Sequence, residues 1–269
     1  MQADRIDTPR VGRAFFAIAL IGLGIEHFIF GEFVTVRAPA WPESIPGGAI
    51  WAPLTGLAFA VAGAAVLLGR RARSAAILAA VLIGAWALLR HIPVLAAAAF
   101  LSPAWTGAGK ALTLTGGALA IAATFPATDI SRRTTLRKLT NLRGEFMVAG
   151  RLCLGVFLVI TGIQHFKYTT FVASLIPAWF PGNAVSWTYF AGVALIAGGI
   201  GLFIPRTARL AALLSGLMVF SWFWIVHIPR TFVSVSDSIA VFEALAVSGI
   251  AFVLAGHSSE DERQRRDSL

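Results

Sequence analysis

Eight apolar runs dominate this sequence, each close to the roughly 20 residues that a helix needs to cross a bilayer. They cover residues 11–30, 50–69, 74–95, 107–125, 146–166, 186–204, 207–228 and 236–256. Of all residues, 57% are hydrophobic and only 13% are charged, which is more apolar surface than a water-soluble core can hold. Because helices satisfy their own backbone hydrogen bonds in lipid, the sequence predicts an all-α integral membrane protein with eight transmembrane helices.

The second half of the chain repeats the first. The segment Gly24-Ile25-Glu26-His27-Phe28 returns 138 positions later as Gly162-Ile163-Gln164-His165-Phe166. Further on, His91-Ile92-Pro93 returns 136 positions later as His227-Ile228-Pro229. Each half holds four of the apolar runs, so both halves enter the membrane in the same sense, as a parallel repeat.

We therefore expect two parallel-repeat four-helix bundles packed side by side. The first repeat covers residues 1–130, and a basic cytoplasmic linker covers residues 131–145. The second repeat, with a cytoplasmic tail, covers residues 146–269.

The formal net charge of +9 comes from basic clusters between the apolar runs. Clusters precede the first run and follow the second, fourth, sixth and eighth runs, which places all of them on one side of the membrane. Cytoplasmic loops carry such an excess of Lys and Arg, so both termini are predicted to be cytoplasmic. This pattern accounts for the charge without a nucleic-acid partner. The single cysteine, Cys153, excludes an intramolecular disulfide and a paired-cysteine redox centre.

Four of the five histidines form two matching pairs, His27 with His91 and His165 with His227. At about 1.5 Å of rise per residue, the first member of each pair lies about 21 Å from the basic end of its helix and the second about 27 Å. All four are therefore expected near the outer face, on helices that run parallel. Two imidazoles at similar depth can hydrogen-bond a ligand, or they can ligate a metal or a haem iron.

Other polar and aromatic side chains fall near the same layer, where ionisable residues are functional-site candidates by default. Glu26 and Arg90 are placed so that an ion pair between them is feasible, and Lys110 has about the place in the first half that Glu243 has in the second. One tryptophan precedes the second histidine of each pair by five residues and is a candidate wall for a flat ligand. The predicted ligand-binding residues are His27, His91, His165, His227, Glu26, Gln164, Trp86, Trp222, Glu243 and Arg90, with the four histidines as candidate metal ligands.

The repeated pattern Gly-Ile-x-His-Phe is followed by a further Phe, by Pro-Ala-Trp in the outer loop and by a Gly-rich second helix that ends at basic residues. This pattern resembles the DoxX family of four-helix membrane proteins, once over residues 11–125 and again over residues 146–256. The resemblance implies a tandem DoxX-like protein of a bacterial-type cytoplasmic (inner) membrane. The family is named after a membrane subunit of a thiosulfate:quinone oxidoreductase, so quinone-linked redox chemistry is implied by analogy. This chain differs in its duplication and in the His-Ile-Pro of each third helix.

Several functions remain open at this point. In the first, a paired-His pocket near the outer face of each bundle binds a small apolar or redox-active ligand, quinone-like, and the protein assists membrane redox chemistry with a redox partner protein. In the second, each pair binds a haem or a metal ion. In the third, the repeats form a small-molecule transporter, and in the fourth the histidines only tie helices together. The sequence has no nucleotide fingerprint and no Ser/His/Asp arrangement, so it does not decide whether the protein is an enzyme.

Overall fold

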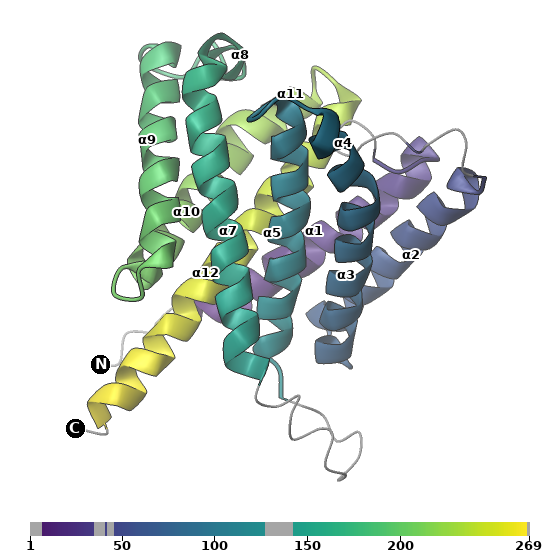
Figure 1. The fold of residues 1–269 in the computed structure, drawn as a ribbon, viewed down its shortest axis with the longest axis vertical. Helices are drawn as coiled ribbons and strands as arrows, with labels where there is room; N and C mark the ends of the chain where they lie inside the picture. The colour runs from purple at the N-terminus through teal and green to yellow at the C-terminus, as the bar shows by residue number, and fades with distance from the viewer. Residues whose placement is uncertain (1–6, 35–40, 42–45, 127–141, 268–269) are drawn as a thin grey trace.

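The computed structural model describes residues 7–34, 41, 46–126 and 142–267, and the regular elements among them are all helical (Figure 1). This confirms the predicted all-α class for the described residues. The long helices are α1 (Thr8–Phe30), α2 (Gly48–Leu67), α3 (Ala72–Trp86), α5 (Pro103–Ala123), α7 (Leu142–Lys167), α9 (Ala184–Phe203), α10 (Ala208–Trp222) and α12 (Ser238–Asp267). The short elements are two π-helical turns, η1 (Ala87–His91) and η2 (Phe223–His227), a 3-10 turn, η3 (Val235–Asp237), and α4 (Ile92–Ala97), α8 (Thr169–Ser174) and α11 (Ile228–Thr231).

Seven helices of the described chain are long and apolar enough to cross a membrane. Two of these spans are composite, because α3 continues through η1 and α4, and α10 continues through η2 and α11. The helix that falls short of the expected eight is α5, which has the length of a span but is rich in Gly, Ala and Thr. The predicted linker also ends early, because α7 begins at Leu142; residues 127–141 lie outside the described part of the chain.

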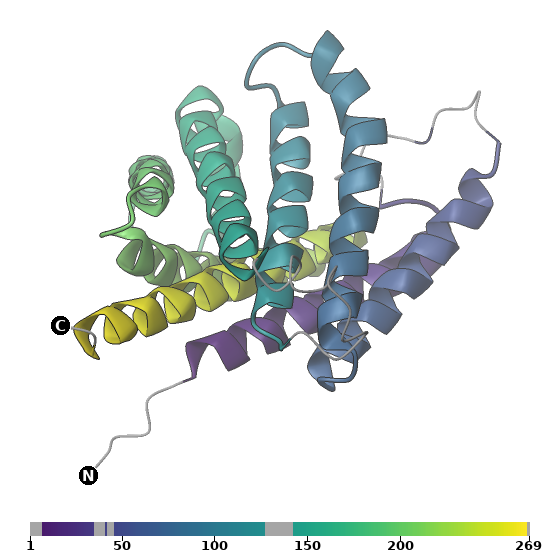
Figure 2. The same ribbon diagram turned by 60° about the horizontal axis from the view of Figure 1, so that its bottom comes forward.

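The long helices pack in a ring, in the order α1, α2, α3, α5, α7, α9, α10, α12 and back to α1. Across the middle of this ring α5 also contacts α12 (Figures 1 and 2). The most enclosed span is that of α12, of which 89% is buried, against 50% or less for the other six spans. The helices at the centre are therefore the fourth helix of each half.

Each of these fourth helices packs along the first helix of the other half. The helix α1 runs beside α12 (Figure 2), and α7 runs beside α5. Glycines bring the backbones together at both interfaces: a Cβ atom on Gly249 would lie 2.6 Å from the Gly12 carbonyl oxygen, and one on Gly150 would lie 2.9 Å from the Gly116 carbonyl oxygen. The two halves thus share α5 and α12, whereas two separate four-helix bundles were expected.

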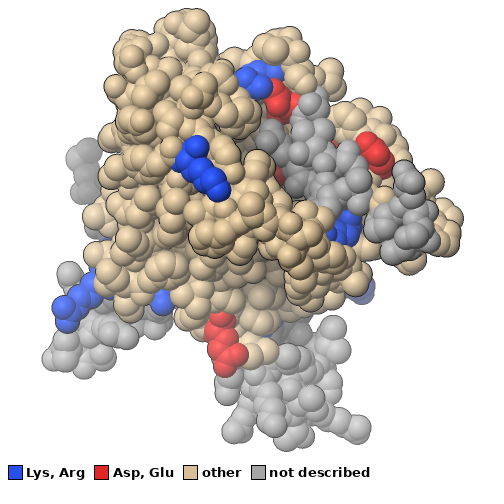
Figure 3. All heavy atoms as spheres, turned by 45° about the horizontal axis from the view of Figure 1, so that its top comes forward, with Lys and Arg blue, Asp and Glu red and all other residues tan. Residues whose placement is uncertain are grey.

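The outer surface is rich in large apolar side chains. Leu68, Ile29 and Phe190 are 71%, 65% and 61% exposed. On the face in Figure 3, isolated charged side chains lie on a surface of mostly uncharged residues. Lipid tails tolerate such a surface, because the backbone polar groups beneath it are already bonded within helices.

Candidate functional site

The first histidine of each pair lies in the last turn of a long helix, His27 in α1 and His165 in α7. The Nδ1 atom of His27 donates a hydrogen bond to the Leu23 carbonyl oxygen, and that of His165 donates to the Thr161 carbonyl oxygen, both at 2.7 Å. A carbonyl oxygen only accepts, so Nδ1 carries the proton in each ring. In the neutral ring, Nε2 is then a hydrogen-bond acceptor or a metal ligand.

The second histidine of each pair, His91 or His227, ends a π-helical turn. Pro93 and Pro229 follow two residues later. A proline has no N–H group, so the α-helical bond to the fourth residue before it cannot form. One wide turn carries each helix past this break, and such single π-turns are frequent at functional sites.

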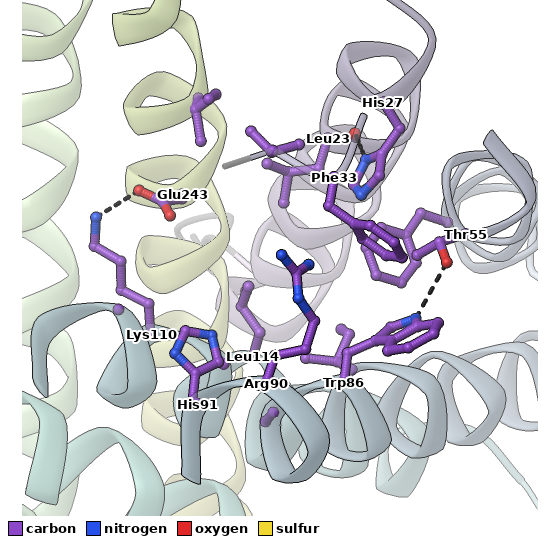
Figure 4. Close-up of a pocket in the computed structure, with 17 residues that line it drawn as sticks. Leu23, His27, Phe33, Thr55, Trp86, Arg90, His91, Lys110, Leu114 and Glu243 are labelled. Atoms are coloured by element: carbon purple, nitrogen blue, oxygen red, sulfur yellow. Dashed lines mark hydrogen bonds and ion pairs between the residues drawn. The ribbon is translucent and has the colours of Figure 1, made fainter. Parts of the chain in front are cut away.

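His27 and His91 line one cavity of about 120 Å³, which is enclosed by α1, α2, α3, η1, α5 and α12 (Figure 4). We call it the first cavity. Both histidines are buried. The polar part of the lining consists of His27, Thr55, Trp86, Arg90, His91, Lys110 and Glu243. The structure therefore brings the first predicted histidine pair to a single space.

Phe33 and Trp86 line the first cavity and form an aromatic cluster with Trp41. The Phe33 ring stacks on Trp41 with centroids 5.2 Å apart, and the Trp86 ring meets these two edge-on at 5.0 and 5.7 Å. The Trp86 indole N–H donates to the Thr55 hydroxyl at 3.1 Å, which ties α3 to α2. Phe33 is only 4% exposed, so its ring is buried in this cluster.

Arg90 places a cation in the first cavity. Its side chain is 7% exposed, and the guanidinium carbon lies 4.4 Å from the centre of the Phe33 ring. Figure 4 shows the guanidinium pointing away from its own helix, into the space between His27 and Lys110. Its Nε and Nη2 atoms have no hydrogen-bond partner among the residues that the structure describes. The first cavity thus contains a buried cation with two unused donors.

His165 and His227 line a second and larger cavity of about 540 Å³, between α7, α8, α9, α10, η2, α5 and α12. We call it the second cavity. The His165 ring stacks on Trp222 with centroids 6.1 Å apart. Apolar and aromatic residues make up most of the wall, among them Phe157, Phe171, Phe180, Trp187, Leu195, Met218 and Ile225. The second predicted pair therefore also lines one space, and Trp222 lies beside it.

Gln164 precedes His165 and joins α7 to the start of α5. The Thr106 hydroxyl donates to Gln164 Oε1 at 2.7 Å, and Gln164 Nε2 donates to the carbonyl oxygens of Ser102 and Leu101 at 2.9 and 3.3 Å. Gln164 and Thr106 both line the second cavity. These hydrogen bonds fix the amide at the edge of that cavity.

An ion pair lies between the two cavities. Lys110 Nζ on α5 lies 2.5 Å from Glu243 Oε2 on α12, and both residues line both cavities. These are the residues that occupy corresponding places in the two halves. The pair therefore forms a polar partition at the contact between the two fourth helices.

Glu26 lines neither cavity, unlike the other predicted ligand-binding residues. It is 2% exposed, and neither carboxylate oxygen has a hydrogen-bond partner among the described residues. Ser238 on α12 is near enough for a weak hydrogen-bonding interaction with this carboxylate, although its hydroxyl donates to the Val235 carbonyl oxygen at 2.7 Å. Among the residues that the structure describes, no ion pair joins Glu26 to Arg90. The pairing considered from the sequence therefore does not form. Glu26 faces α12, whereas Arg90 faces the first cavity.

Several residues of these cavities were not predicted as site residues, among them Lys110, Phe33 and Thr106. Phe33 covers Arg90. The sequence repeats this residue as Phe171, but the repetition did not indicate a role. Thr106 holds the Gln164 amide and gave no signal, because Ile239 stands at the corresponding place of α12.

The candidate metal and haem ligands fit the two cavities differently. Within the described residues, no group of three or more His, Cys, Asp and Glu side chains could hold a metal ion. The first cavity, at about 120 Å³, lies below the roughly 300 Å³ at which pockets for drug-sized ligands begin, so a haem does not fit there. In the second cavity, the Nδ1–H of His165 bonds to a carbonyl oxygen, as in many metal-bound histidines.

Comparison with known proteins bears on the second half. Residues 154–248 match a domain of unknown function, DUF8561. The match runs from α7 into α12 and covers less than half of the chain. No curated protein and no solved structure matches. The matched segment includes both histidines of the second cavity and Glu243, but not Lys110 or the first histidine pair.

Proposed function

We propose that this chain is a multi-pass membrane protein whose second cavity binds a small, mostly apolar, redox-active molecule of the quinone class. The observation that carries this proposal is the second cavity itself. Its volume of about 540 Å³ lies in the range of about 300–1,000 Å³ that is typical of small-molecule pockets. Its wall is largely apolar, with a few polar groups, among them His165, His227 and Gln164.

The histidines supply hydrogen bonds at the polar atoms of such a ligand. Because His165 donates through Nδ1 to Thr161, its Nε2 accepts a hydrogen bond from a hydroxyl group, which a quinol has and a quinone lacks. The Trp222 indole stacks on His165 and offers a flat face beside it. This arrangement favours a planar ring over a flexible chain at the polar end of the cavity.

The same proposal includes the topology. We propose eight transmembrane helices, with α5 as the eighth, in a tandem DoxX-like parallel repeat with both termini on the cytoplasmic side of a bacterial-type inner membrane. The corresponding hydrogen bonds of His27 and His165, the two π-turns and the matching glycine contacts support the repeat. The low hydropathy of α5 is tolerable, because it packs against α3, α7 and α12.

The protein would assist redox chemistry rather than carry it out alone. It has one cysteine and no nucleotide fingerprint, so electrons would pass between the bound quinone and a redox partner protein. The outer-face position proposed for the cavities would place that partner on the outer side of the membrane.

Binding of decylubiquinol to the purified protein in nanodiscs tests the proposal, with quenching of tryptophan fluorescence as the readout. His165→Ala and His227→Ala should each weaken binding about tenfold, which corresponds to about one lost hydrogen bond. His27→Ala, at the matching position of the first half, is the control and should leave the affinity unchanged. No saturable quenching, or an equal loss in all three variants, would contradict the proposal.

Haem binding in the second cavity is the alternative that the same preparation separates. The support for it is the His165 Nδ1 hydrogen bond described above. A Soret band that disappears in the His165→Ala and His227→Ala variants would show that the second cavity binds haem instead of a quinone. A transporter would instead show ligand flux across the vesicle membrane.

A further inference from the structure

We propose that the first cavity is a binding site for a small oxyanion, held side-on by the guanidinium of Arg90. The site differs from the second cavity in position and in ligand chemistry, so it goes beyond the quinone proposal. It rests on a buried cation with unused donors, a cavity of limited size and the charges around that cavity.

The unused donors of Arg90 form one edge of the guanidinium. The Nε–H bond and one N–H bond of Nη2 point in the same direction, which is the fork that a carboxylate or a phosphate accepts with two oxygens. Neither nitrogen has a hydrogen-bond partner among the described residues, and the side chain is 7% exposed. Phe33 covers one face of the same group at 4.4 Å, which holds its orientation and leaves the edge accessible (Figure 4).

The size of the cavity restricts the anion. Its volume of about 120 Å³ lies well below the roughly 300 Å³ at which pockets for drug-sized ligands begin, which favours a small ligand. A formate, an acetate or an inorganic phosphate has this size, and so does the phosphate of a lipid headgroup. These share one chemistry, a compact oxyanion with at least two oxygens.

The charges that face the cavity favour an anion. Lys110 from α5 and Glu243 from α12 offset each other in their ion pair, and the other titratable lining residues are the histidines His27 from α1 and His91 from η1, which add no negative charge. Arg90 therefore leaves the lining with one positive charge. Glu32, which interacts electrostatically with Arg90, does not line the cavity, and Glu26 faces α12. An ionised residue within a span is costly, and a bound anion would neutralise it.

The second half provides an internal comparison. Val226 occupies the place of Arg90 there and lines the second cavity. The oxyanion site is therefore expected in the first cavity alone, and an Arg90→Val variant reproduces the second half at this position.

Thermal unfolding of the purified full-length protein in detergent tests the proposal, with sodium acetate titrated against sodium chloride at constant ionic strength. The wild-type melting temperature should rise and saturate with acetate. Arg90→Lys keeps the charge but loses the fork, so its apparent affinity should fall at least about tenfold. Arg90→Val should show no response. Arg206→Gln removes an exposed cation between α9 and α10 and should respond as the wild type does.

Further arms identify the source of the anion. Inorganic phosphate replaces acetate in one arm, and phosphatidylglycerol added to the detergent is compared in another with diacylglycerol, which has no phosphate. A saturable response to any of these probes that depends on Arg90 supports the proposal. It is overturned if no probe gives a response in the wild type, or if Arg90→Lys responds with wild-type affinity. Where Arg90→Val does not fold, the Arg90→Lys result decides. Quinol binding is measured in the same preparation, so failure of one proposal is distinguishable from failure of the other.

Discussion

Phe33 and Phe171 occupy matching positions in the two halves and have opposite surroundings. Phe33 is 4% exposed, stacks on Trp41 and covers Arg90, whereas Phe171 is 64% exposed. Trp41 and Trp179 differ in the same way, since Trp179 is 65% exposed. The first cavity, which Phe33 lines, has a volume of about 120 Å³, and the second, which Phe171 lines, has a volume of about 540 Å³. Matching residues of the two halves therefore have different surroundings beside the two cavities.

The helices themselves are alike in the two halves. The first histidine of each pair donates to the carbonyl oxygen four residues earlier, and a π-turn carries the second histidine in each half. The cavities also share the pair of Lys110 and Glu243. One scaffold thus supports two spaces of different size and charge, and the following variants test how far this difference goes.

Removing the shared ion pair should have the largest effect. Lys110→Met leaves the Glu243 carboxylate buried without its partner at 2.5 Å, which should reduce the free energy of unfolding by about 3–5 kcal/mol. The double variant Lys110→Met with Glu243→Met should recover most of that loss, because no charge is then left alone. Unfolding in SDS, analysed as a double-mutant cycle, measures both effects. A loss below about 1 kcal/mol would mean that the pair behaves like a solvated one.

The matched phenylalanines should differ nearly as much. Phe33→Ala removes a buried ring from the aromatic cluster and should cost about 3 kcal/mol of unfolding free energy. Phe171→Ala removes a mostly exposed ring and should cost less than about 1 kcal/mol. Thermal unfolding of the two variants side by side gives the comparison. Similar losses would show that the two aromatic positions are equally packed, against the contrast drawn above.

Hydropathy was sufficient to predict the all-helical class and most of the spans. Seven of the predicted runs correspond to helices long and apolar enough to span, and the repeated histidines line cavities in matching pairs. The shortfall at α5 comes from its small residues, which suit close packing against neighbours and lower its hydropathy.

A single sequence does not predict that the fourth helix of each half packs along the first helix of the other half. Both halves have the same apolar pattern, so nothing in it decides whether α1 packs against α5 or α12. The pairing of Lys110 with Glu243 depends on that choice and was missed for the same reason. The contrast between Phe33 and Phe171 was hidden too, because the same residue type stands at both positions.

Adding a side chain at the close contact between the first and second helices should destabilise both halves equally. A Cβ atom on Gly24 would lie 2.6 Å from the Gly56 carbonyl oxygen, and one on Gly162 would lie 2.8 Å from that of Gly192. Gly24→Ala and Gly162→Ala should therefore each cost about 2 kcal/mol, since the backbones must separate. Gly144→Ala, with nothing within 4 Å, is the control and should be neutral or slightly stabilising. Unequal losses, measured by unfolding in SDS, would show that the helix scaffold also differs.

The last comparison concerns the position before the first histidine, which is Glu26 in one half and Gln164 in the other. Gln164 uses both ends of its amide in hydrogen bonds, whereas both oxygens of Glu26 lack a partner within the described chain. Glu26→Gln replaces a buried carboxyl group by a neutral amide and should raise the free energy of unfolding by about 1 kcal/mol.

The reciprocal change, Gln164→Glu, should lower the free energy of unfolding by about 2 kcal/mol, because a carboxylate has no donor for the Ser102 and Leu101 carbonyl oxygens. Thermal unfolding of both variants, with the wild type in the same detergent, measures the pair. If Glu26→Gln were destabilising as well, the carboxylate would stabilise the α1–α12 contact. The surroundings of this position would then suit Glu in the first half and Gln in the second.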